Sequence, residues 1–236
     1  MTLAENIQKV QARIAAAAEQ AGRDPSEVTL VAATKVQTSE TIRAAIAAGI
    51  MVCGENRAQE FTQHWQDGAY EGAKVHFIGH LQKNKLKYLV GKVDLIESVD
   101  SEELIRLIDK RAQNLGIVQD ILIEVNIGGE ASKSGVKPEE VEALVALAAS
   151  LPGVEPRGLM AIPPVAQEPG ANRAVFAAMR QLFIDIKGKT YNNKVNIDCL
   201  SMGMSGDFED AIAEGATQVR VGTALFGARP ANRVNG

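Results

Sequence analysis

The chain has 236 residues, of which 46% are hydrophobic and 23% are charged. This length and composition predict one compact domain over residues 1–236, with a sizeable core and the usual size of an eight-stranded α/β barrel. The net charge of −4 lacks the basic excess that binds phosphate backbones, so nucleic acid is not an expected partner.

The first segment predicts a helix. Thr2 stands three residues before Glu5, as in a capping box, and apolar residues recur at helical spacing from Leu3 to Ile14. A signal peptide would need a continuous apolar stretch here, and no later run reaches membrane-spanning length. We therefore expect a cytoplasmic protein with no membrane partner.

Eight short apolar or β-branched runs follow, and each predicts a strand. They are Val28–Lys35, Met51–Glu55, Val75–Gly79, Leu95–Val99, Ile121–Ile127, Gly158–Ile162, Cys199–Met202 and Gln218–Gly222. The stretches between them predict helices at Ser39–Ala48, Arg57–Gln66, Asn84–Leu89, Ser101–Leu115, Pro138–Ala149, Asn172–Ile186 and Asp207–Glu214. Gly49, Gly116 and Gly215 stand where three of these helices should stop.

Regular alternation of strands and helices predicts a (β/α)8 TIM barrel with an extra N-terminal helix. An open, doubly wound sheet could use the same elements, but it would carry a G-x-G-x-x-G turn after its first strand. Here that turn reads Thr34-Lys35-Val36-Gln37. The chain contains none of the common metal-binding patterns, so no metal is expected.

Two glycine-rich loops predict a phosphate site. In a closed barrel the last strand pairs with the first, and the loops after strands seven and eight commonly bind phosphate. The chain has Ser201–Gly206 after strand seven and Gly222–Gly227 after strand eight. Glycines let the backbone approach an anion, and the hydroxyls of Ser201, Ser205 and Thr223 add donors.

Lys35 ends the first strand, one strand away from these loops. A lysine at a strand end is usually a solvated surface group, but an amine beside a phosphate site suits a ligand that has both an aldehyde and a phosphate. Pyridoxal 5′-phosphate (PLP) is such a ligand, and Lys35 would hold it as a Schiff base.

Arg220 lies two residues before Gly222, on the same face of strand eight. It could be a salt-bridge residue of the barrel interior. Beside PLP, it could instead donate to the pyridine nitrogen and keep that nitrogen unprotonated, which would weaken the ring as an electron sink.

Several segments together resemble those of the pyridoxal phosphate homeostasis proteins. They are Ala33-Thr34-Lys35, Gly54-Glu55-Asn56-Arg57, His76 to Lys85, Leu200 to Ser205, and Val219 to Gly227. The match keeps its order over nearly the whole chain. The resemblance implies a barrel similar to the N-terminal domain of alanine racemase.

The resemblance also implies roles for individual residues. Lys35 would be the cofactor lysine and Arg220 the partner of the pyridine nitrogen. The phosphate shell would comprise Ser201, Ser205, Gly222 and Thr223, while Asn56 and His80 would line the cofactor face. His80 could equally be a polar residue behind the site. The lysines at 83, 85 and 87 most simply form a solvated helix face, but they could instead contact a partner or a free phosphate.

Two function classes remain open. The first is a PLP-binding protein of PLP homeostasis, monomeric and without major turnover, which carries, buffers or delivers the cofactor to apo-enzymes. The second is a PLP-dependent racemase, which needs a base on each face of the substrate. Tyr70, Tyr88 and Tyr191 all fall away from the predicted strand ends, which favours the first class.

Overall fold

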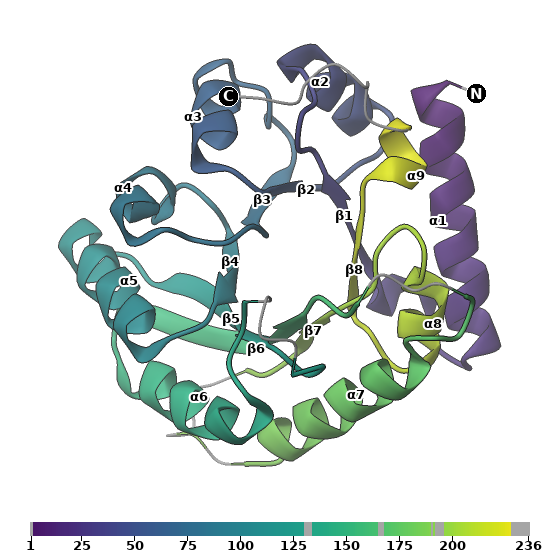
Figure 1. The fold of residues 1–236 in the computed structure, drawn as a ribbon. Coiled ribbons are helices and arrows are strands. Elements are labelled where there is room, and N and C mark those ends of the chain that lie inside the picture. The colour runs from purple at the N-terminus through teal and green to yellow at the C-terminus, as the bar shows by residue number, and fades with distance from the viewer. Residues whose placement is uncertain (1, 130–133, 165–167, 190, 192–195, 228–236) are drawn as a thin grey trace.

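Eight parallel strands close into a barrel in the computed structural model, which describes residues 2–129, 134–164, 168–189, 191 and 196–227 (Figure 1). The strands are β1 (Thr29–Ala33), β2 (Val52–Glu55), β3 (Lys74–Phe77), β4 (Leu95–Val99), β5 (Gln119–Val125), β6 (Val154–Ala161), β7 (Cys199–Ser201) and β8 (Gln218–Val221). Each strand pairs with the next one along the chain, and β8 pairs with β1. The predicted barrel is confirmed.

Helices surround the barrel (Figure 1). They are α1 (Leu3–Gln20), α2 (Ser39–Ala47), α3 (Ala58–Gln66), α4 (Leu86–Leu89), α5 (Glu102–Leu115), α6 (Val141–Ser150), α7 (Arg173–Lys187), α8 (Phe208–Ala213) and α9 (Thr223–Phe226). Short 3₁₀ turns lie at Pro25–Glu27, Lys83–Lys85 and Pro138–Glu140. The extra helix α1 begins at Thr2 with the predicted capping box and packs against α8 and α9.

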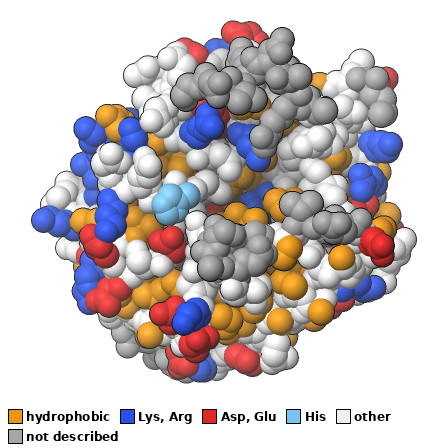
Figure 2. Space-filling view, viewed as in Figure 1, with side chains coloured by type: hydrophobic (Ala, Val, Ile, Leu, Met, Phe, Trp, Pro, Cys, Tyr) orange, Lys and Arg blue, Asp and Glu red, His pale blue; other side chains and the backbone are white. Residues whose placement is uncertain are grey.

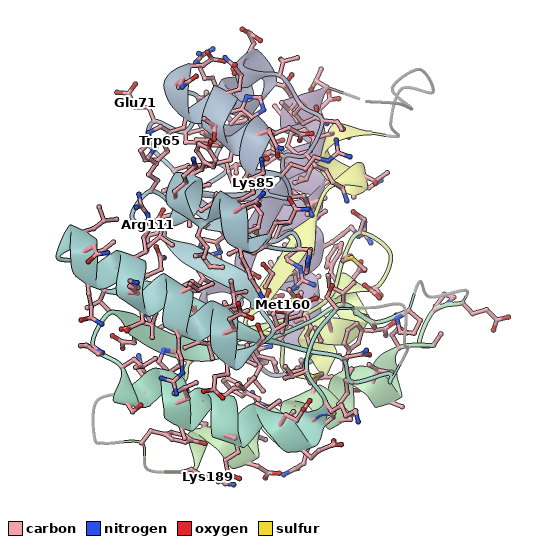
Figure 3. All side chains as sticks on the ribbon, turned by 60° about the vertical axis from the view of Figure 1, so that its left-hand side comes forward. Trp65, Glu71, Lys85, Arg111, Met160 and Lys189 are labelled. Carbon is pink, nitrogen blue, oxygen red and sulfur yellow. The ribbon has the colours of Figure 1, made fainter. Side chains whose placement is uncertain are left out.

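Alternate strand residues face the helices and the barrel interior, as the strand repeat of two requires. The outward-facing residues join the helices in one large apolar core, to which Ala32, Phe77 and Ile121 belong. Two smaller apolar clusters fill part of the interior. One comprises Val31, Ala33, Val52 and Ile78, and the other comprises Leu95, Leu122 and Met160 with Cys199. Figure 3 labels Met160 of the second cluster.

The remaining inward positions carry polar side chains. Each is an even number of residues away from an inward-facing apolar residue or glycine in the same strand or directly after it, so it points into the barrel. They are His76, Glu97, Glu124, Ser201, Gln218 and Arg220, and all are buried. A barrel interior is usually filled by branched apolar residues. Core packing alone therefore does not explain these six buried polar side chains.

Several predicted bounds are wrong by a few residues. Strand one ends at Ala33, so Lys35 lies in the following turn rather than in the strand. Strand six begins at Val154 rather than Gly158, because Pro156 lies at a shift of register where a ladder hydrogen bond is not needed. The predicted helices at 84–89 and 138–149 both begin as 3₁₀ turns, and the single turn α9 was not predicted at all.

In the part of the chain that the structure describes, none of the helices combines the length and the apolar character that crossing a membrane requires.

Candidate functional site

Lys35 lies in a tight turn immediately after β1. The backbone N–H of Gln37 donates to the carbonyl of Thr34 at 3.0 Å, which places Lys35 and Val36 at the centre of the turn. Val36 has φ of 61°, a left-handed conformation that strains a β-branched residue by about 1–3 kcal/mol. Its N–H donates to the carboxylate of Glu60 on α3 at 3.1 Å. The turn that presents Lys35 is therefore held in one conformation from the neighbouring α3.

The residue before Lys35 is anchored to β2. Burial raises the pKa of Glu55 to about 7, although hydrogen bonds from Thr34 and Tyr70 partly oppose the rise. The Thr34 hydroxyl lies 2.5 Å from Glu55 Oε1, and the Tyr70 hydroxyl donates to the same oxygen at 2.8 Å. Glu55 Oε2 is buried and makes no hydrogen bond within the described residues. Glu55 protonated on Oε1 fits these surroundings, because that oxygen can then donate to Thr34, whose own hydroxyl reaches the carbonyl of Gly54 at 3.2 Å.

Gly222 directly follows β8, the strand that pairs with β1. Val221 is opposite Ala32, and a side-chain carbon at Gly222 would lie 3.4 Å from Ala33. The hydroxyl of Ser205 accepts the backbone N–H groups of Gly222 at 3.2 Å and Ala224 at 3.3 Å. Both of its lone pairs are then occupied, and its own hydrogen remains to be donated. The hydroxyls of Ser205 and the exposed Thr223 thus lie beside Gly222 as a group of donors near the end of β1.

Arg220 is buried in the barrel beneath this group. Its Nη1 donates to Ser201 Oγ at 2.6 Å and its Nη2 donates to the carbonyl of Ala161 at 2.8 Å. Ser201 in turn donates to Glu97 Oε2 at 2.6 Å. The structure therefore gives the Ser201 hydroxyl partners other than the phosphate that the sequence predicted for it.

Two carboxyl groups balance the charge of Arg220. Burial would raise the pKa of Glu97, but hydrogen bonding to His76 and the charges of His76 and Arg220 outweigh it, so the pKa lies below its ordinary value. Burial raises the pKa of Glu124 to about 7, and Asp100 adds to the rise while Arg220 opposes it. Burial also lowers the pKa of Arg220 itself, against the charges of Glu97 and Glu124.

Asn56 and His80 follow β2 and β3, on the other side of β1. The Oδ1 atom of Asn56 is buried and has no hydrogen-bond partner within the described residues. The backbone at Gly79 passes so close to Asn56 that a side-chain carbon there would lie 2.1 Å from the Asn56 carbonyl oxygen, so only glycine fits at position 79. His80 is exposed, with Nδ1 3.9 Å from Asp100, and lines a cavity of about 540 Å³ with Asn56 and Lys85.

Closure of the barrel brings Lys35, Ser205, Arg220, Gly222 and Thr223 to one end of the β1–β8 pair. Figure 2 shows this face, with Lys and Arg side chains around its centre. Asn56 and His80 lie at the rim, beside the neighbouring strands. Two kinds of residue were not predicted from the sequence: Glu60, which accepts from the Lys35 turn, and Glu97 and Glu124, whose charges act on Arg220. Acidic residues inside otherwise apolar strands were the signal for the second kind.

The family model for the N-terminal domain of alanine racemase matches residues 3–230. A pyridoxal phosphate homeostasis protein of Aquifex aeolicus is 46% identical over 97% of this chain and 99% of its own. The chain belongs to the family of pyridoxal phosphate homeostasis proteins. The family resemblance predicted from the sequence is thereby confirmed.

Two solved structures place this homeostasis-family barrel among known folds. PipY of Synechococcus elongatus PCC7942, solved with PLP bound, is 32% identical, with a TM-score of 0.83 over 96% of this chain and 100% of that one. Alanine racemase of Clostridium difficile 630 has a TM-score of 0.72 at 16% identity, over 98% of this chain and 59% of that one. The second likeness shows the fold alone.

The buried Glu55 predicts a pH dependence of stability. Its pKa in the folded protein is raised from 4.5 to about 7, so its stabilising contribution is complete below pH 4.5 and is lost as the pH rises through 7. Glu55→Gln keeps a neutral group of the same shape. Between pH 4.5 and pH 8, the free energy of unfolding of the variant should rise relative to the wild type by up to about 3 kcal/mol.

Urea unfolding at the two pH values measures this difference, and Glu139→Gln on an exposed position is the control. Parallel pH profiles for the Glu55 variant and the wild type would show that folding does not change the pKa of Glu55.

Proposed function

We propose that this protein binds PLP and serves PLP homeostasis, carrying, buffering or delivering the cofactor without major turnover of its own. Membership of a family whose curated relatives are named for this role supports the proposal, as does a related barrel solved with PLP. The observation that carries the proposal is that the amine of Lys35 and the hydrogen-bond donors around Gly222, which could bind an anion, lie at the same end of the β1–β8 pair.

The residues at this end fit the two reactive parts of PLP. When bound, PLP supplies an aldehyde that condenses with a primary amine. Lys35 would supply that amine, from a turn held by Glu60 and anchored through Thr34. Ser205, Thr223 and the backbone N–H of Thr223 beside Gly222 would donate to the phosphate, with the Ser205 hydroxyl already aligned by two amides.

Other residues fit the ring. Arg220 uses two of the five N–H groups of a guanidinium on Ser201 and Ala161, and we propose that another donates to the pyridine nitrogen. A donor there keeps a proton off that nitrogen. Asn56, whose Oδ1 has no hydrogen-bond partner among the described residues, and the exposed His80 would line the cofactor face from the ends of β2 and β3.

Ser201 changes its proposed role. A hydroxyl has one hydrogen and two lone pairs. Ser201 gives its hydrogen to Glu97 and accepts from Gln218 and Arg220, so no donor is left for a phosphate. We propose that it supports Arg220 and that the phosphate shell consists of Ser205, Gly222 and Thr223.

The positions of the tyrosines support a carrier rather than a racemase. Tyr70 is buried against Glu55 on the helix side of β2. Tyr88 lies on α4, its ring 5.0 Å from the Lys87 ammonium. Tyr191 follows α7 and packs against the outer core. A racemase of this type needs a second base facing Lys35, and none of these hydroxyls faces it.

The cellular setting remains part of the proposal. We propose a monomer that works in the cytoplasm and passes PLP to apo-enzymes. Cys53 and Cys199 are both free thiols, which is what a reducing compartment maintains.

Lys35→Ala should abolish covalent attachment of PLP and leave the barrel folded, because a half-buried residue in a turn contributes little to the core. Borohydride reduction in the presence of PLP, followed by peptide mapping, measures the attachment. Lys35→Arg is the matched control, since it keeps the charge but lacks a condensing amine and should also remain unlabelled. Labelling of another lysine in the wild type, with Lys35 unmodified, would contradict the assignment.

Ser205→Ala and Thr223→Val should each weaken PLP binding about two- to tenfold, because a neutral hydrogen bond contributes about 0.5–1.5 kcal/mol. Pyridoxal, which lacks the phosphate, should bind the variants and the wild type equally. Fluorescence titration with both ligands measures this difference. An equal loss for pyridoxal would place both hydroxyls away from the phosphate.

The PLP-loaded protein should restore activity to an apo-enzyme that depends on PLP, while exchanging the Cα hydrogen of amino acids negligibly. Exchange of that hydrogen with deuterated water, followed by NMR, detects proton abstraction even without net product. Exchange at about 1–10³ s⁻¹, the usual range for enzymes, would favour the racemase alternative.

A further inference from the structure

We infer that Glu97 is a positioning residue for Arg220, acting through Ser201, and that it thereby sets the hydrogen bond from Arg220 to the pyridine nitrogen. This inference rests on the proposed function, because it takes the ligand of Arg220 to be PLP. It adds a residue on β4 that does not reach the cofactor face.

Glu97 is the centre of a continuous set of hydrogen bonds inside the barrel. Its Oε1 lies 2.9 Å from His76 Nδ1 and 2.6 Å from Gln218 Nε2. Its Oε2 accepts the Ser201 hydroxyl at 2.6 Å. Ser201 Oγ also receives Gln218 Nε2 at 2.9 Å and Arg220 Nη1 at 2.6 Å. We call these five side chains the interior network.

The direction of every hydrogen bond in the interior network is fixed by chemistry. A carboxylate can only accept, so the Ser201 hydrogen points to Glu97 and the His76 nitrogen that faces Glu97 carries a hydrogen. Ser201 then has two lone pairs left, and Gln218 and Arg220 take them both. The Arg220 Nη1 donor is therefore tied to Ser201, and the guanidinium plane is fixed with it.

The charge of Glu97 also favours the observed position of the Arg220 guanidinium. Arg220 is 4% exposed and Glu97 is fully buried, and Nη1 lies 4.0 Å from Glu97 Oε2. A buried charge needs a partner or it is strongly destabilised, so the carboxylate favours a charged guanidinium at this place. Glu124 is the other carboxyl group that influences Arg220 strongly, but no direct hydrogen bond ties it to Ser201 among the described contacts.

Replacing Glu97 by Gln reverses one hydrogen bond without changing the shape. The new amide must turn its oxygen to His76 and Gln218, which are donors, so its NH₂ faces Ser201. Ser201 would then face three donors with two lone pairs, and its own hydrogen would lose its acceptor. The simplest relief is loss of the Arg220 Nη1 bond, which releases the guanidinium from its position.

The inference is tested with two ligands that differ by one atom. One is PLP, and the other is 1-deazapyridoxal 5′-phosphate, in which a carbon replaces the ring nitrogen. Both keep the aldehyde and the phosphate, and their intrinsic difference in ring electronics is the same for every protein variant. A change in their affinity ratio between variants therefore reports on the contact at the ring nitrogen. Affinities come from fluorescence titration of the full chain.

The wild type should bind PLP more tightly than the deaza analogue. Glu97→Gln should weaken PLP binding roughly tenfold and change binding of the analogue less than about twofold, because a hydrogen bond from a charged donor has lost its alignment. Glu97→Gln in an Arg220→Leu background should add nothing further, since both changes remove the same contact.

Asp109→Asn is the matched control. It changes a buried carboxylate that caps the N–H of Gly153 at 2.7 Å, outside the barrel interior. It should leave the affinity ratio unchanged. If Glu97→Gln fails to fold, Ser201→Ala supplies the test, because it removes the hydroxyl that joins Glu97 to Arg220 and should reduce the ratio in the same way.

The possible results separate the inference from the proposed function. Equal affinity of the wild type for the two ligands would overturn the proposed contact between Arg220 and the nitrogen. A wild-type preference that Glu97→Gln and Ser201→Ala both preserve would overturn the inference alone. So would an equal loss for both ligands, which would make Glu97 a structural residue.

Discussion

Pairing of β8 with β1 is the constraint on which the site depends. Four residue pairs, from Thr29 with Gln218 to Ala32 with Val221, join the two ends of the chain. The Lys35 turn and the Gly222 loop each follow one of these strands, so they become neighbours only when the barrel closes. No local segment of the sequence contains both halves of the site.

Behind this junction the site has two layers. The layer at the ends of β1 and β8 contains Lys35, Ser205 and Thr223, which are partly buried or exposed. The layer beneath it is the interior network with Arg220 at its upper end, and it continues to His76. His76 and Gln218 line a separate cavity of about 830 Å³ at the opposite mouth of the barrel. The interior network therefore spans the barrel from one mouth toward the other.

Sequence patterns were sufficient for the fold because they are local. Strand and helix periodicity, and glycines such as Gly116 at the left-handed end of α5, identified nearly every element. The approach of the Lys35 turn to the Gly222 loop was also predictable, because closure of a barrel determines which strand ends meet. The hydrogen bonds of Ser201 were not predictable, since its neighbours Glu97 and Gln218 come from strands that only the folded barrel aligns. The left-handed backbone conformation of Val36 was likewise not predictable, because β-branched residues normally avoid that conformation.

The charged interior also limits how this barrel can evolve. Well-packed apolar residues often stabilise a protein as well as a buried ionic set does, so folding alone gives no reason to retain Glu97, Arg220 and His76. Losing one member, however, leaves another buried without its partner, and that intermediate is strongly destabilised. Replacing these residues one at a time therefore passes through proteins of reduced stability, whereas replacing them together does not. We expect the three residues to change jointly rather than singly among related proteins.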